Sequence, residues 1–221
     1  MKGRKKKKMI KNKPPIFRAS YSILNSWERG YAQDAINSYF KLERKTNIYM
    51  EAGLKFHKAW EDYINKNKEI HPQLSTKKIK LKNPICELKL EMPINDHMEF
   101  VGVIDCLDEP TILEFKSGTN SASNYASSKQ VPLYSLLAEY HGYKVNKGIY
   151  YHWNQYFKET ECSMIWLTDQ VKKEAKKWLV KVGDEMYNYL LINKYYEKYS
   201  QPSSKNPTIA KKAVLPDLQK S

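Results

Sequence analysis

Two carboxylates and a lysine lie close together near the middle of the chain. Residues 101–107 are mostly apolar or β-branched, a turn-type Asp-Glu-Pro-Thr segment follows, and residues 112–116 resume a short apolar run. This pattern predicts a β-hairpin. Because side chains alternate along a strand, Glu114 and Lys116 leave the same face. Asp105 on the partner strand comes within reach of them if the register pairs it with that face.

These residue types suit the hydrolysis of a phosphodiester bond. A hard cation polarises a phosphoryl oxygen and acidifies a bound water, and proteins hold Mg²⁺ with one or two carboxylates. We therefore expect Asp105 and Glu114 to bind the metal, and Lys116 to orient the attacking water or offset charge on the phosphate. The alternative that the hairpin alone leaves open is an ordinary solvated polar face.

A predicted helix upstream of the hairpin carries a histidine. Residues 51–63 have helical spacing, and Gly53 and His57 stand one turn apart. We expect Gly53 to allow a close approach to another element, with His57 pointing into the resulting crevice. Taken alone, such a histidine is more often a core residue than a ligand. The apolar face available for packing consists of Leu54, Trp60, Tyr63 and Ile64.

A second helix is predicted downstream, from about residue 128 to residue 141, with Gly142 as its C-cap. Gln130 and Tyr134 stand one turn apart on it, so both can face one site. By itself the pair is more typical of a protein surface. The core stripe expected for this helix consists of Leu133, Leu136, Leu137 and Tyr140.

The order of these pieces resembles the RecB-like branch of the PD-(D/E)XK nuclease superfamily. The likeness covers roughly residues 20 to 170 and depends on the ordered set, because no single piece is diagnostic. It implies a restriction-endonuclease-like α/β core, in which helices flank a central mixed β-sheet. The matching pieces are Gly53-xxx-His57, Gly102-Val103-Ile104-Asp105, Glu114-Phe115-Lys116 and Gln130-xxx-Tyr134.

The resemblance implies which residues bind the metal, Mg²⁺ or Mn²⁺. The ligands are the side chains of His57, Asp105 and Glu114, helped by the backbone carbonyl of Phe115. Many relatives also hold an iron-sulfur cluster on four cysteines. This chain has three cysteines, without a paired metal spacing, so we expect neither a cluster nor a disulfide framework, which fits a reducing compartment.

The resemblance also assigns the remaining polar residues of the site. Lys116 matches the catalytic lysine, and Gln130 and Tyr134 match a motif that steadies the active site and the DNA near the cut. A further acidic position matches either Glu87 or Glu91, and the sequence does not choose between them.

The charge of the chain favours a polyanionic partner. The formal net charge is +14 over 221 residues, and residues 1–15 carry eight basic residues without an acidic one. We expect this segment to be a disordered basic arm that binds phosphates, with Lys5, Lys6, Lys7 and Lys8 at its centre. A solubilising tail or a localisation signal is the alternative.

The core of the chain reads as one nuclease domain over residues 16–199, followed by a flexible tail over residues 200–221. No run is long and apolar enough to cross a bilayer, and no secretory signal is evident, so we expect no membrane partner. The expected location is cytoplasmic, at the nucleoid or in a virus-infected cell. The expected helices lie near 20–41, 47–67 and 128–141 and beyond the Thr168 cap, and the strands near 76–82, 85–92, 98–107, 111–116, 147–153 and 162–167.

These observations predict a metal-dependent deoxyribonuclease, by resemblance an exonuclease acting on single strands or DNA ends in replication, recombination or repair. Tyr125, which can stack on an unpaired base, and Lys129 are expected to contact the nucleic acid. One alternative is a non-catalytic DNA-binding subunit that recruits a helicase, a recombinase or a replication protein. Another is a structure-selective endonuclease.

Overall fold

The computed structural model describes residues 15–42, 48–66, 81–118, 122–154 and 159–199. Residues 1–14 of the basic arm, including Lys5 to Lys8, and the tail over 200–221 lie outside these ranges. Most of the strand expected near 76–82 also lies outside them. None of the helices in the described ranges is long and apolar enough to cross a membrane.

The elements follow the predicted order, with a few differences. Gly30, at a φ of 83°, ends the first helix, so one predicted helix is in fact two. The elements are β1 (Phe17–Ala19), α1 (Tyr21–Glu28), α2 (Ala32–Tyr39), α3 (Ile48–Lys66), β2 (Ile85–Asn95), β3 (Met98–Asp108), β4 (Thr111–Gly118), the 3₁₀-helix η1 (Ala122–Tyr125), α4 (Gln130–Tyr140), β5 (Lys147–Asn154), β6 (Glu159–Trp166), α5 (Asp169–Ile192) and α6 (Tyr195–Tyr199).

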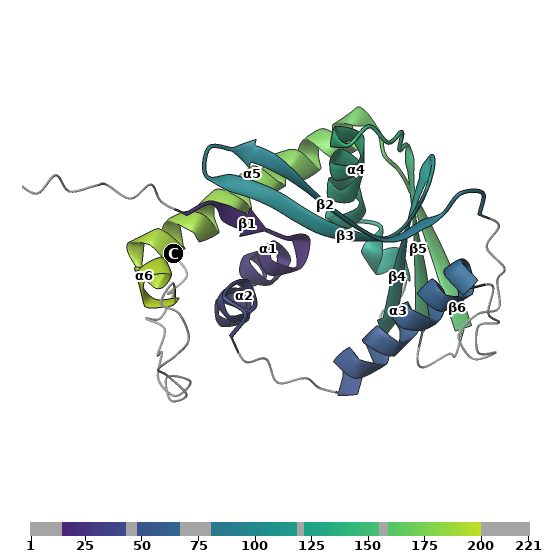
Figure 1. Ribbon diagram of the computed structural model, residues 1–221, viewed down its shortest axis with the longest axis horizontal. Helices are drawn as coiled ribbons and strands as arrows, with labels where there is room; N and C mark the ends of the chain where they lie inside the picture. Colours follow the sequence, from purple (N-terminus) through teal and green to yellow (C-terminus); the bar gives the residue numbers. More distant parts are fainter. Residues whose placement is uncertain (1–14, 43–47, 67–80, 119–121, 155–158, 200–221) are drawn as a thin grey trace, which may run out of the picture.

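Six strands in the described ranges form one mixed sheet around the long strand β3 (Figure 1). Antiparallel β2 pairs with β3 along nearly its whole length. On the other edge of β3, parallel β1 pairs near the start and antiparallel β4 pairs near the end. Beyond β4 come parallel β5 and antiparallel β6. The predicted hairpin and the predicted α/β class with a central mixed sheet are therefore confirmed.

Helix α3 covers one face of the sheet, and α4 and α5 lie on the other (Figure 1). Phe56 and Trp60 of α3 are buried, and the Trp60 ring stacks on Phe115 of β4 with centroids 4.7 Å apart. Leu54 is 68% exposed, so its predicted place in the buried face is wrong. Phe56 is the residue of this turn that packs against the sheet instead.

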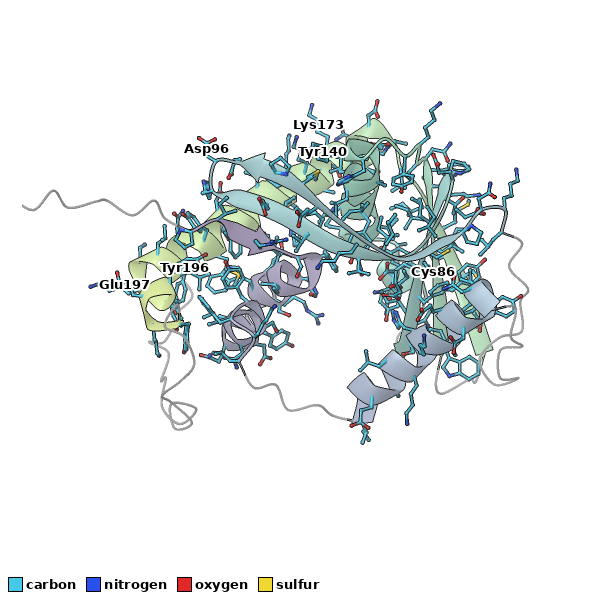
Figure 2. The ribbon with its side chains drawn as sticks, viewed as in Figure 1. Cys86, Asp96, Tyr140, Lys173, Tyr196 and Glu197 are labelled. Carbon is cyan, nitrogen blue, oxygen red and sulfur yellow. The ribbon has the colours of Figure 1, made fainter. Side chains whose placement is uncertain are left out.

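Helix α4 packs unusually close to the sheet because two strand residues facing it are glycines. A Cβ on Gly102 would lie 2.7 Å from the Tyr134 ring, and one on Gly148 would lie 2.3 Å from Val131. Leu133 and Leu137 are buried as expected. Tyr140 is 58% exposed and projects at the surface (Figure 2), so its predicted place in the core stripe is wrong. The residues that complete the buried face instead are Val131, Tyr134 and Ala138.

Candidate active site

The hairpin opens at the predicted site. Backbone pairing between β3 and β4 runs from Asp108 with Thr111 to Cys106 with Leu113, and does not continue to Asp105 and Glu114. At that point the backbone N–H of Phe115 donates to Oδ2 of Asp105 at 2.8 Å. The Asp105 side chain therefore accepts the hydrogen bond that a strand partner would otherwise accept, which fixes its carboxylate beside β4.

Glu114 is the buried centre of the polar cluster, at 1% exposure. Lys116 Nζ donates to its Oε1 at 2.7 Å, and Gln130 Nε2 donates to the same oxygen at 2.5 Å. The other oxygen, Oε2, is buried and has no hydrogen-bond partner among the described residues. Burial and the nearby charge of Asp105 raise the pKa of Glu114 to about 7, against the opposing effect of Lys116.

The ammonium group of Lys116 stays charged in this setting. Burial opposes the charged form, but the carboxylates of Glu114 and Asp105 outweigh it and raise the pKa of Lys116 above its usual value. The side chain of Lys116 is 21% exposed, so it spans from the buried carboxylate to the surface of the cluster. A cation is therefore held where a phosphate could reach it.

Gln130 and Tyr134 meet Glu114 as the sequence predicts. Both side chains are buried, and Gln130 Nε2 lies 3.2 Å from the hydroxyl of Tyr134. Burial and the charge of Glu114 raise the pKa of Tyr134 well above its usual value, so the phenol keeps its proton. The first turns of α4 thus bring an amide and a phenol to the site, made possible by the close approach at Gly102.

A second cluster on the edge of the site can hold a divalent cation. His57, Glu87 and Asp105 each offer one ligand atom, and these atoms lie within 4.8 Å of one another. His57 Nδ1 is 3.4 Å from Asp105 Oδ1. Burial lowers the pKa of His57, but the contact with Asp105 outweighs it and leaves the pKa raised. Asp105 belongs to both clusters and joins them.

The structure distinguishes the two acidic residues between which the sequence left the choice open. Glu91 forms an ion pair with Arg18, away from the site. Two successive residue pairs join β2 to β3 at this point. Glu87 on β2 and Asp105 on β3 lie opposite each other between these two pairs. The φ of Glu87, 52°, lies in the left-handed region, which is strained for a residue with a side chain. The candidate ligand group therefore contains Glu87, and Glu114 lies beside it with an oxygen that has no hydrogen-bond partner among the described residues.

Phe115 contributes its backbone to the site and its side chain to the core. Its N–H is bound to Asp105, and its ring packs on Trp60 on the opposite face of the sheet. The proposed use of its carbonyl as a metal ligand stays a prediction.

A pocket of about 600 Å³ adjoins Lys116 and Gln130. Tyr125 and Lys129, both predicted to contact nucleic acid, line it. Tyr21 and Trp178 were not predicted at this site, because they come from α1 and α5 and meet only in the folded chain. The other lining residues are Asn25, Glu28, Arg29, Asn124, Ser127 and Ser128.

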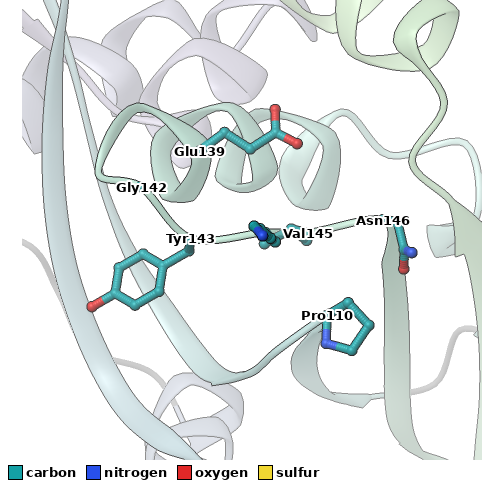
Figure 3. Close-up of a pocket in the computed structure, with 7 residues that line it drawn as sticks. Pro110, Glu139, Gly142, Tyr143, Val145 and Asn146 are labelled. Carbon is teal, nitrogen blue, oxygen red and sulfur yellow. The ribbon is translucent and has the colours of Figure 1, made fainter.

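Another hollow, of about 390 Å³, lies at the opposite end of β4, next to the hairpin turn (Figure 3). Its walls include Pro110, Glu139, Tyr143 and Asn146, and none of the candidate catalytic residues. It belongs to the scaffold, where the backbone N–H groups of Asn146 and Lys147 donate to the carbonyl of Pro110.

Two of the three cysteines are neighbours in the sheet. Cys86 and Cys106 face each other across β2 and β3, with Cys86 near α3 (Figure 2) and Cys106 fully buried. Cys162 is exposed on β6.

No family model matches this sequence, and no curated protein matches it. The chain does resemble solved structures. A putative exonuclease from Eubacterium rectale is 12% identical with a TM-score of 0.53, over 81% of this chain and 82% of that one. This likeness supports the α/β fold seen here.

Two further solved structures resemble the chain at lower TM-scores. A protein described as SSO0001 is 14% identical with a TM-score of 0.47, over 77% of this chain and 79% of that one. The alkaline exonuclease LHK-Exo from Laribacter hongkongensis is 11% identical with a TM-score of 0.43, over 82% and 95%.

Proposed function

We propose that this protein is a metal-dependent deoxyribonuclease of the RecB-like branch of the PD-(D/E)XK superfamily. The observation that carries the proposal is the meeting of Asp105, Lys116 and Gln130 around the buried carboxylate of Glu114, whose Oε2 has no partner within the described ranges. A buried carboxylate without full compensation costs folding free energy. A bound cation would remove that cost, and this supports a functional role for the cluster.

The residues present fit a hard divalent cation. His57, Glu87 and Asp105 offer three donors within 4.8 Å, and Glu114 adds a free oxygen beside them. When bound, Mg²⁺ or Mn²⁺ would polarise a phosphoryl oxygen and acidify a water molecule. His57 would bind the metal as the neutral imidazole, so metal binding would compete with protonation of His57.

The chain's own residues supply position and charge. Lys116, fixed by its 2.7 Å contact with Glu114, can donate to the attacking water or to the phosphate oxygen on which charge grows. Gln130 holds Glu114 from α4 and lies 3.2 Å from the Tyr134 hydroxyl. This chain of hydrogen bonds keeps the carboxylate oriented while a phosphate binds.

The proposed substrate is DNA, as single strands or ends, and the proposed reaction is exonucleolytic. The putative exonuclease of similar fold, the net charge of +14 and the basic pocket beside Lys116 support this choice. The processes in which such an activity serves are replication, recombination and repair, where a helicase, a recombinase or a replication protein would be its partner.

The function is tested by incubating the pure protein with end-labelled linear and with circular single-stranded DNA, with and without Mg²⁺. Metal-dependent release of nucleotides from the linear DNA alone is the expected result. Cleavage of the circular DNA would show endonuclease activity, and would favour the structure-selective endonuclease over the exonuclease. Inert DNA in every reaction, together with DNA binding, would contradict the nuclease and favour the non-catalytic subunit.

A further inference from the structure

The pocket beside Lys116 has walls that two side-chain hydrogen bonds hold in place. Ser128 donates to the hydroxyl of Tyr21 at 2.9 Å, which joins the loop before α4 to α1. Trp178 Nε1 donates to Glu28 at 2.7 Å, which joins α5 to α1. Neither bond is needed for the proposed metal site. They set the shape of a cavity that continues from the reacting end of Lys116.

Aromatic rings form one part of this pocket. The rings of Tyr21 and Trp178 lie 5.9 Å apart and are tilted by 43°. Tyr125 closes another side and is itself held by stacking on Tyr150, with centroids 5.7 Å apart. Rings of this kind give a sequence-tolerant surface for a nucleobase, because every base has a π-face.

The remaining part of the pocket is polar and mostly cationic. Arg29, Lys116 and Lys129 line it against one acidic residue, Glu28. The Glu28 carboxylate accepts from Trp178, and it can also accept from an amino group on a base edge. The cations suit a phosphate, and a volume of about 600 Å³ falls within the range for sites that bind one small ligand.

We propose that this pocket binds one unpaired nucleotide of the substrate strand, with its base against Tyr21 and Trp178 and its phosphate toward Lys129 and Arg29. The inference rests on the proposed nuclease function for its link to the cut. A base can enter such a pocket only when it is unpaired. The substrate class is therefore single-stranded DNA, or an end whose last base pair has opened.

The test measures binding rather than cleavage, in EDTA, with the full chain and fluorescent single-stranded oligonucleotides. A single abasic site is moved along the strand one position at a time. We expect about tenfold weaker binding when the missing base is the one in the pocket, and little change at most other positions. Equal binding at every position would overturn the proposal.

Variants show whether Trp178 is responsible. Trp178→Leu should bind the intact strand less tightly and lose the position-specific effect of the abasic site, whereas Trp178→Phe should keep part of it. Trp27→Leu is the matched control, because Trp27 is half-buried, packs on Tyr189 and does not line the pocket. If Trp27→Leu removes the effect as well, or Trp178→Leu leaves it unchanged, the pocket is not the base site.

A surface variant covers the case in which Trp178→Leu does not fold. Arg29 is exposed, so Arg29→Gln should fold normally and should lower the dependence of binding on salt. Lys173→Gln, at an exposed position on α5 outside the pocket, should leave the salt dependence unchanged. Equal salt dependence in wild type and Arg29→Gln would remove the phosphate contact from the proposal.

The two proposals fail in different ways. Cleavage that ignores the abasic position would keep the nuclease and reject the pocket. Position-specific binding without any cleavage would keep the pocket and reject the nuclease.

Discussion

Gln130 donates a hydrogen bond of 2.5 Å to Glu114, which lies sixteen residues earlier in the chain. The two residues sit on different layers, one at the start of α4 and one in the middle of β4. Helix α4 can bring the amide this close because Gly102 and Gly148 leave no side chain between helix and sheet. The orientation of the buried carboxylate is therefore set by the packing of the fold around it.

Replacing Gln130 tests this orientation. Gln130→Leu should lower the cleavage rate about 10- to 100-fold, the range found when a group that orients a metal ligand is lost. DNA binding should change much less. Gln170→Leu is the matched control, because Gln170 is exposed on α5 and donates to Glu174 of the same helix. Unchanged cleavage by Gln130→Leu would show that Glu114 needs no support from α4.

Lys116→Ala should abolish cleavage while sparing DNA binding. The ammonium group is the cation closest to Glu114, and the removal of one group that stabilises developing charge typically costs 10²- to 10³-fold or more in rate. Single-turnover cleavage and binding by fluorescence anisotropy measure the two effects separately. Lys89→Ala, at an exposed position on β2, should retain full activity. Cleavage that survives in Lys116→Ala would refute the assigned role.

Substitutions of two glutamates on β2 test the metal site. Glu87→Gln should weaken Mn²⁺ binding, measured by calorimetry, because Glu87 belongs to the ligand group. Glu91→Gln should bind the metal as the wild type does, because Glu91 pairs with Arg18 instead. Asp105→Ala should remove metal-dependent cleavage altogether. If the two Gln variants bind equally well, Glu87 is not a ligand.

Much of the site could be predicted because its signals are local. The hairpin follows from alternation and turn chemistry within about fifteen residues, and the pairing of Gln130 with Tyr134 follows from one helical turn. The structure brings both to Glu114, as expected.

The features that the sequence missed depend on contacts between distant segments. Glu87 and Glu91 are equivalent in a pattern of period two, and only the backbone conformation at Glu87 and the strand register separate them. The helical spacing of α3 likewise allows either Leu54 or Phe56 to lie on its buried face. The position of the sheet determines that Phe56 is buried and Leu54 is exposed. Trp178 reaches the pocket because α5 packs on α1, a contact across 150 residues between Trp178 and Glu28.

Gly102→Ala should destabilise the fold by about 1–3 kcal/mol through overpacking. A Cβ there would lie 2.7 Å from the Tyr134 ring and 3.0 Å from Leu137, so these side chains or the helix that carries them must shift. Gly53→Ala is the matched control, because its Cβ would meet only Ser117 Oγ at 3.7 Å. That variant should be as stable as the wild type or up to about 1 kcal/mol more stable. Urea unfolding measures both, and equal stability of the two variants would contradict the close packing.

The buried carboxylate of Glu114 should make the stability of the metal-free protein depend on pH. Its pKa is raised from 4.5 to about 7 in the folded state, so ionisation is opposed by the fold. The neutral carboxyl of Glu114 makes its full contribution to the free energy of unfolding below pH 4.5. As the pH rises to about 7, this free energy should fall by at most about 3 kcal/mol. Added Mg²⁺ should restore stability at the higher pH, since a cation favours the ionised carboxylate.

Urea unfolding of wild type and Glu114→Gln between pH 4.5 and 8 separates this contribution from those of other groups. The variant lacks the titrating carboxyl, so the difference between the two curves should shrink or reverse as the pH rises. Because metal binding needs the ionised form, cleavage by the wild type should increase through about pH 7. Parallel curves for the two proteins would show that Glu114 ionises at its ordinary pH and is not buried without compensation.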